Sequence, residues 1–179
     1  MVPVEEKNPG SGAFSAFAES VYARDTVRET CLEWQDRYGA DVNLLLFACW
    51  FGLTRGEMPD GLMQQAVQLS SAWQEKITGP LRQCRRDMKH WHPGGVRTPR
   101  SPDYEALRAQ IKAAELDAER QQEADLKALC DRHGSWRAPG PGQSGALVRA
   151  NLALYCLEAG IIADPAELSP LVDQALKTA

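Results

Sequence analysis

Apolar residues recur along much of the chain at intervals of three and four positions, the spacing that places them on one face of an α-helix. The clearest stripe consists of Val27, Cys31, Trp34 and Tyr38. No run of alternating apolar and polar residues bounded by turn residues indicates a β-strand. The sequence therefore predicts an all-α protein, folded as a single-domain helical bundle.

Capping residues and helix breakers divide this pattern into about seven to eight helices. Thr26 and Glu29 have the spacing of a capping box, and Gly39 supplies a stop. Gly79 and Pro80 are expected to interrupt the chain between the fourth and fifth helices. The expected helices span residues 13–23, 26–39, 41–56, 60–78, 79–91, 101–133 and 146–160, and start signals for short terminal helices lie near 164 and 169.

The most apolar stretch is DVNLLLFACWFGL, from Asp41 to Leu53. Its continuous apolar run is about ten residues long, whereas a helix needs roughly 20 residues to cross the hydrocarbon layer of a membrane. Asp41 is a suitable N-cap, and Gly52 or Gly56 lies near the expected end. We therefore interpret the stretch as a core helix and expect no membrane segment.

The chain divides into a short leader and one domain. Residues 1–12 lack a basic region followed by an apolar one, so we expect a flexible leader, no secretion signal and a cytoplasmic protein. Residues 13–179 are expected to form the single helical domain. The loop 92–102 is rich in proline and glycine and should join two helices, capped by Thr78 and Ser101, into a long antiparallel hairpin.

The two helices of this hairpin carry opposite charge, although the net charge of the chain is only −4. Residues 76–100 hold seven basic side chains and one acid, whereas residues 101–131 hold eight acids and four bases. Three glutamates of the second helix lie one turn apart, an unfavourable ladder unless cations lie opposite. The candidate charged network comprises Lys112, Glu115, Glu119 and Glu123, and the candidate basic helix comprises Arg82, Arg85, Arg86, Lys89 and Trp91.

This charge pattern supports two functions. If the hairpin pairs internally or with a partner, it predicts a non-enzymatic adaptor or regulatory protein that binds another protein through the charged hairpin. Alternatively, region 76–100 binds nucleic acid, with basic side chains on phosphates and Trp91 stacked on a base, close to His90 and His92. The acidity of the whole chain opposes a general affinity for polyanions.

A third alternative, a metal-binding protein or an enzyme of unknown chemistry, has weaker support. Cys84, His90 and His92 form one possible ligand cluster, and Cys130 with His133 forms another, but neither matches a strong zinc pattern. The five cysteines are scattered through apolar helical patterns, which is typical of reduced core thiols. The sequence contains no Glu-x-x-His unit, phosphate-binding glycine loop or nucleophile elbow. No catalytic residue, metal or cofactor is predicted.

Two polar residues, Asp41 and Asn43, stand at the entrance of the apolar stretch. Helix capping and the charge of a first helical turn explain both of them. The alternative is a buried polar pair that organises a ligand pocket.

Three segments carry a family resemblance. They are VYARDTVRETCLEWQDRYGADVNLLLFACWFG, PLRQCRRDMK and LRAQIKAAELDAERQQEADLKAL, and an aromatic start at Phe14 precedes them. In this order they resemble a family of small bacterial proteins known as a domain of unknown function, in which a QD-x-x-G-x-DVNLLL element precedes a basic RR-x-x-K helix and an AELEAE-like helix. The likeness covers most of residues 14–129, and its most specific piece is the element at 41–46.

The resemblance implies a soluble, cytoplasmic helical protein and transfers no catalytic residue. It also implies that eight polar residues belong to one recurring arrangement, either a structural network or a binding surface. These residues are Asp41, Asn43, Arg85, Arg86, Lys89, Lys112, Glu115 and Glu119.

Overall fold

The computed structural model describes residues 14–91, 100–134 and 136–178. These residues form helices and contain no strand, which confirms the predicted all-α class. The predicted leader and residues 92–99 of the predicted loop lie outside the described part. The elements are α1 (Phe14–Tyr22), α2 (Asp25–Tyr38), α3 (Val42–Thr54), α4 (Asp60–Trp73), a π-helical segment η1 (Gln74–Thr78), α5 (Gly79–His90), α6 (Pro102–Arg132), α7 (Ser144–Glu158), a 3-10 helix η3 (Pro165–Leu168) and α8 (Ser169–Leu176).

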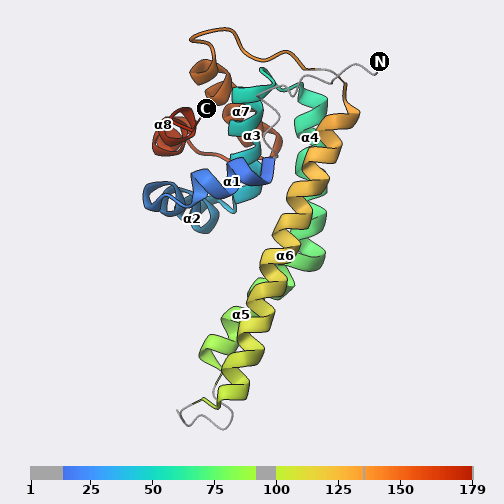
Figure 1. The fold of residues 1–179 in the computed structure, drawn as a ribbon, viewed down its shortest axis with the longest axis vertical. Coiled ribbons are helices and arrows are strands. Elements are labelled where there is room, and N and C mark those ends of the chain that lie inside the picture. The colour runs from blue at the N-terminus through green and yellow to red at the C-terminus, as the bar shows by residue number, and fades with distance from the viewer. Residues whose placement is uncertain (1–13, 92–99, 135, 179) are drawn as a thin grey trace, which may run out of the picture.

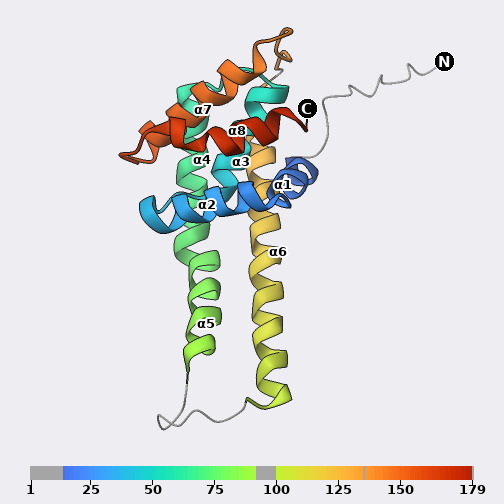
Figure 2. The same cartoon turned by 90° about the vertical axis from the view of Figure 1, so that its left-hand side faces the viewer.

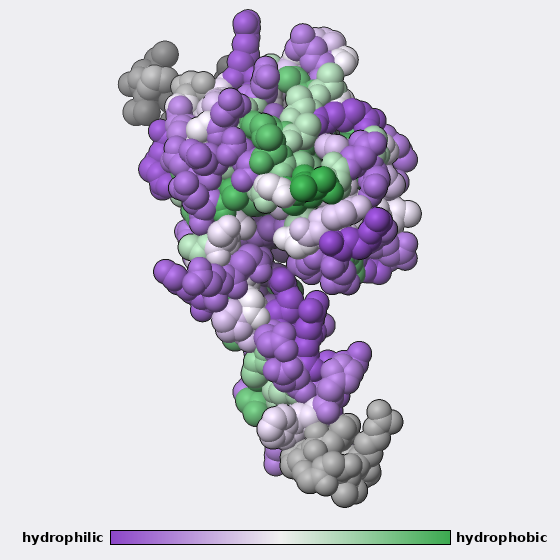
Figure 3. All heavy atoms as spheres, turned by 180° about the vertical axis from the view of Figure 1, so that it is seen from behind, coloured by the Kyte–Doolittle hydropathy of each residue, from purple (hydrophilic) through white to green (hydrophobic). Residues whose placement is uncertain are grey.

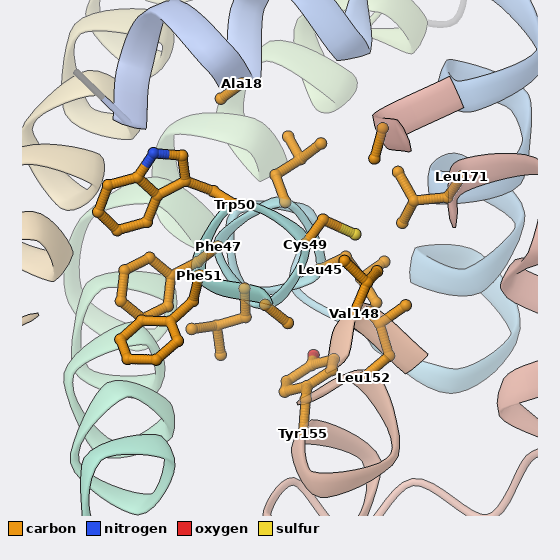
Figure 4. Close-up of a cluster of buried hydrophobic side chains, with 14 of the residues drawn as sticks. Ala18, Leu45, Phe47, Cys49, Trp50, Phe51, Val148, Leu152, Tyr155 and Leu171 are labelled. Atoms are coloured by element: carbon orange, nitrogen blue, oxygen red, sulfur yellow. The ribbon is translucent and has the colours of Figure 1, made fainter. Parts of the chain in front are cut away.

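Helix α3 is the centre of the globular part, as predicted for the most apolar stretch. Every residue from Asn43 to Gly52 is buried, because α1, α4, α6, α7 and α8 all pack around the helix. Figure 4 shows Phe47, Trp50 and Phe51 on one side of α3 and Leu45 and Cys49 on the other. None of the helices in the described ranges is both long enough and apolar enough to cross a membrane.

Gly52 brings α3 into close contact with α7. A Cβ at this position would lie 2.8 Å from the backbone Cα and N of Val148. The sequence predicts Gly52 or Gly56 near the end of this helix. The helix ends at Thr54, and Gly56 follows with a φ of 98°. Gly52 lies inside the helix, so its role is packing and not termination.

Helix α2 ends where the sequence predicts but begins differently. Gly39 adopts a left-handed conformation and its N–H bonds to the carbonyl of Gln35, as expected of a C-cap glycine. The predicted capping box is wrong, because the N-cap is Arg24 and the helix starts at Asp25. Thr26 is therefore already inside the first turn, where its carbonyl accepts a bond from the Thr30 hydroxyl.

The predicted interruption at Gly79 and Pro80 is also wrong. The chain passes from α4 through the π-helical turn of η1 directly into α5. A side chain at Gly79 would lie 2.2 Å from the carbonyl oxygen of Gln74, so only glycine fits this wide turn. Thr78 does not cap α5, because its hydroxyl bonds back to the carbonyl of Trp73. Ile77, in the last turn of the predicted fourth helix, is 41% exposed.

The C-terminal helices cover α3 on one side. Helix α7 packs against α3 along much of its length. Its outer face is nevertheless open, since Leu157 is 75% exposed. Asp164 caps η3 as predicted, through a bond from the N–H of Ala166, whereas Ser169 does not cap α8.

Helices α5 and α6 form the predicted antiparallel hairpin. Ser101 caps α6 as expected, by accepting a bond from the N–H of Tyr104. Figures 1 and 2 show α5 and the first half of α6 projecting from the globular head. With 31 residues, α6 is about 46 Å long. We call the projecting part, α5 with residues 102–114, the arm; its surface is mostly hydrophilic with small apolar areas (Figure 3).

Candidate functional site

The base of the arm carries a cluster of four charged residues, here called the charged cluster. On α5, Arg82 donates from Nε to Glu115 at 3.1 Å and from Nη2 to Glu119 at 2.9 Å. One turn along, Arg85 donates to both carboxylate oxygens of Glu115, with Nη2 at 3.2 Å. The predicted pairing of the basic helix with the glutamate ladder is therefore present across the hairpin for these two arginines.

Burial and charge act in opposite directions on the two glutamates of the cluster. Burial favours a higher pKa for Glu115, but hydrogen bonds and charges from Arg85 and Arg82 outweigh it and lower the pKa below the usual value. For Glu119, burial prevails over its single arginine partner and raises the pKa. Glu115 is thus held as a carboxylate, whereas ionisation of Glu119 is opposed by its surroundings.

Four residues of the predicted binding set lie outside the charged cluster. Arg86 reaches only Asp36, at 3.9 Å, and both side chains are exposed. Lys89 and Lys112 are exposed and form no ion pair with a residue in the described ranges. Trp91 is 62% exposed at the end of α5. Arg86 follows Arg85 directly and therefore points in another direction, whereas Lys89 and Lys112 keep the spacing of the cluster but lie further along the arm.

Glu123, the third residue of the predicted ladder, turns toward the head. Its Oε2 accepts a hydrogen bond from Ser15 Oγ on α1 at 2.7 Å. Burial raises the pKa of Glu123, and the negative charges of Glu19 and Glu119 add to the effect. The three glutamates therefore lie in two environments. Glu115 and Glu119 are paired with arginines, whereas Glu123 lies near other carboxylates.

Asp41 is the hub of a buried polar network. Its Oδ1 caps α3 by accepting from the N–H of Asn43 at 2.7 Å, as predicted. Its Oδ2 accepts from Ser70 Oγ, from Gln74 Nε2 at 3.2 Å and from Gln122 Nε2 at 2.8 Å. Four donors on one carboxylate tie α3 to α4, η1 and α6.

Sequence reasoning missed the partners of Asp41. Ser70 follows the buried residues Leu62 and Ala66 at the same interval of four positions. A polar residue at such a position could have been predicted to form a buried hydrogen bond. Gln122 occupies the same kind of position on α6, four residues before the buried Leu126. Tyr155 gave no such signal, although its hydroxyl accepts from the backbone N–H of Asp41 at 2.8 Å.

A pocket of about 360 Å³ opens between the network around Asp41 and the charged cluster. Residues from α1, α2, α3, η1, α5 and α6 line it. Asp41, Asn43, Arg82, Glu115 and Glu119 all contribute to its wall. The predicted polar entrance and the predicted charged network are thus two sides of one cavity, which sequence spacing did not reveal.

The predicted metal-ligand clusters do not assemble in the described ranges, where no three histidine, cysteine or acidic side chains are grouped to hold a metal ion. Cys84 is exposed on α5, which contradicts the prediction that all five cysteines are core thiols, and His92 lies outside the described residues. Cys130 is buried, whereas His133 is exposed and contacts Gln65 at 3.3 Å.

Burial also governs the thiols. The other four cysteines are buried and free, in agreement with the predicted reduced core thiols. Burial raises the pKa of the Cys31 thiol to about 12 and that of the Cys130 thiol to about 11. Neither thiol is activated as a nucleophile, because a nucleophilic cysteine needs a lowered pKa.

A family model described as "Protein of unknown function (DUF2390)" matches residues 14–126. The match extends from the start of α1 through most of α6 and contains every residue that lines the pocket. It agrees with the resemblance drawn from the sequence motifs. No curated protein and no solved structure matches the chain.

Proposed function

The chain belongs to the DUF2390 family of proteins of unknown function, and from the geometry of its own residues we propose that it is a non-enzymatic adaptor that binds another protein through the arm. One observation carries the proposal. In α5 and in residues 102–114 no residue is buried, although these segments contain leucine, isoleucine, methionine and tyrosine side chains. The arm lacks a core of its own.

A two-helix projection of this kind exposes apolar surface to water. Leu107 is 50% exposed and Trp91 is 62% exposed. Burying a large apolar side chain contributes about 1.5–3 kcal/mol, so a partner that covers these residues would stabilise both molecules. A hairpin that leaves such apolar residues exposed can accept a further amphipathic helix, as in helical bundles.

The charges beside these apolar residues favour a partner with acidic flanks. Arg86 and Lys89 are exposed on α5, and Lys112 is exposed on α6. The partner that fits the arm is therefore a protein with an amphipathic helix, apolar on one side and acidic at its edges. A cytoplasmic location is part of the proposal and is supported by the free thiols of the described cysteines.

Affinity capture from cell extract, read by quantitative mass spectrometry, tests the proposal with a matched pair of variants. Leu107→Ser removes an exposed leucine of the arm, and Leu157→Ser removes an exposed leucine of α7. We expect the same partner to be lost with Leu107→Ser and retained with Leu157→Ser. Substituting glutamate for Arg86 and Lys89 should reduce the amount of partner that is captured. It should also make the capture less sensitive to salt concentration. A partner set that is equal for the two leucine variants contradicts the proposal.

Nucleic-acid binding is the alternative, and one observation favours it: Arg86, Lys89 and Trp91 are exposed together toward the end of α5. Against it, Arg82 and Arg85 already bind glutamates and offer little to phosphates. Retention of RNA or DNA that falls with salt above about 50 mM, and falls again in Lys89→Ala, would support this alternative. Absence of retention at that salt concentration removes it.

A further inference from the structure

The pocket at the base of the arm contains more negative than positive charge once its internal pairs are formed. Arg82 and Arg85 are matched by Glu119 and Glu115. Asp41 and Glu123 also line the pocket, and neither forms an ion pair within the described part of the chain; all of their hydrogen-bond donors are neutral groups. Partly buried carboxylates without a cation are costly, so the pocket is suited to receive one.

The side-chain amide of Asn43 adds a hydrogen-bond acceptor, and its neighbours fix which of its atoms donates and which accepts. The Asp41 carboxylate can only accept, so Gln122 must present its Nε2 to it, at 2.8 Å. The Oε1 of Gln122 then accepts from Asn43 Nδ2 at 3.2 Å. This order leaves Asn43 Oδ1 without a donor among the described residues, in a side chain that is only 8% exposed and lines the pocket.

The arginines at the pocket do not favour an anion at its floor. Arg82 and Arg85 direct their donors to the two glutamates of the charged cluster. The other two lining arginines, Arg86 and Arg120, are 54% and 60% exposed and lie at the rim. An anion that passed this rim would face Glu119 and Glu123 on the wall, where the two remaining guanidinium groups are already paired with glutamates.

Part of the wall is apolar. Leu32, Leu46 and Leu116 contribute side chains from α2, α3 and α6. The volume of about 360 Å³ lies near the lower limit of small-molecule sites, roughly 300–1,000 Å³. We propose that the pocket binds a small organic cation, an amine with a short aliphatic body, whose ammonium group is held by Glu123, Glu119 and Asn43 Oδ1.

Isothermal titration calorimetry on the full chain tests this site with three probes of similar length. Cadaverine carries ammonium groups, pentanediol replaces them with hydroxyls, and glutarate replaces them with carboxylates. We expect saturable binding of cadaverine alone. Glu123→Gln keeps an acceptor for Ser15 but removes the charge, and it should weaken binding about tenfold or more.

Two further variants keep the result interpretable. Glu19→Gln changes an exposed carboxylate at the pocket and should weaken binding by a smaller factor, whereas Glu29→Gln, on the exposed face of α2, should leave it unchanged. Thermal unfolding of each variant confirms that it is folded. The proposal is overturned if cadaverine shows no saturable binding, if Glu123→Gln and Glu29→Gln bind it equally, or if glutarate binds in its place.

Discussion

At the scale of single residues, Gly52 sets the distance between α3 and α7. Gly52→Ala should lower the free energy of unfolding by about 1–3 kcal/mol, because the new methyl group would overlap the backbone of Val148, which cannot rotate away. The gain in helix propensity of about 1 kcal/mol offsets part of this cost. Urea denaturation measures the effect. Gly61→Ala is the control, since no atom lies within 4 Å of its added Cβ, and equal stabilities for the two variants would contradict the packing argument.

Asp41 accepts four hydrogen bonds, and Asp41→Asn tests whether they stabilise the head. An asparagine has one acceptor oxygen and turns an NH2 group toward donors, so at least one donor loses its partner. We expect a loss of about 2 kcal/mol or more in the free energy of unfolding. Asp164→Asn is a matched control, because Asp164 is exposed and accepts one bond, from Ala166, and asparagine caps helices as well as aspartate does. Similar losses in both variants would speak against the network.

Glu123 should make stability depend on pH in an unusual direction. Its folded-state pKa is raised above the usual 4.5, so its contribution to stability is fully present below that value and is lost as pH rises through the folded pKa. Glu123→Gln should therefore unfold at a higher denaturant concentration than the unmodified chain at pH 7. The difference should vanish below pH 4.5. Denaturation curves across this range check it, and a difference independent of pH would contradict it.

Local sequence rules reached Asp41 but not its partners. A capping aspartate acts on the N–H two residues ahead, so its role follows from neighbouring positions. Ser70, Gln74 and Gln122 lie 29, 33 and 81 positions away, and only the fold brings them to Asp41. The sequence left two interpretations of Asp41 and Asn43 open, helix capping and a ligand pocket. Both residues line a cavity, which the second interpretation requires.

At the scale of elements, the hairpin was predictable from the proline- and glycine-rich loop between two helical patterns. The opposite charges of the two helices were compatible with pairing across the hairpin, but they also left binding to a partner open. Helix-breaking residues were less informative. The helix does not end at Gly79 and Pro80, and a π-helical turn precedes them. Proline at the start of a new helical segment loses no required bond, so its presence alone does not predict a stop.

The charged cluster should fix α5 against α6, and Arg85→Leu tests this. The substitution leaves Glu115, 7% exposed at its side chain, with Arg82 alone. Breaking a fully buried pair costs about 3–5 kcal/mol; because Arg85 is partly exposed, we expect about 1–3 kcal/mol. Arg86→Leu is the neighbouring control, with a single exposed contact to Asp36, and should change stability by less than about 0.5 kcal/mol. Equal effects in chemical denaturation would show that the cluster adds nothing.

At the scale of the whole molecule, the chain combines a dense head with a weakly packed arm. The continuous apolar composition of α3 predicted its burial in the head, whereas α7, which is also rich in apolar residues, buries only one side. Periodicity did not predict that α5 would contain no fully buried residue, since apolar spacing such as that of Leu81 and Met88 indicates a face without showing how completely that face is covered. The projecting shape arises from the length of α6, which extends beyond the head that it helps to close.

This uneven packing should be visible in native-state hydrogen exchange. Amides of α5 and of residues 102–114 should open with a much lower free energy than those of α3, because neither segment contains a fully buried residue. Mass spectrometry resolves the two regions in one experiment. Protection should fall off along α6 from Leu126 toward Tyr104, with Glu115 near the change, since it is the first buried residue of the helix. Uniform protection along α6 would mean that the arm is stabilised by itself and needs no partner, and the proposed adaptor function would then lose its physical basis.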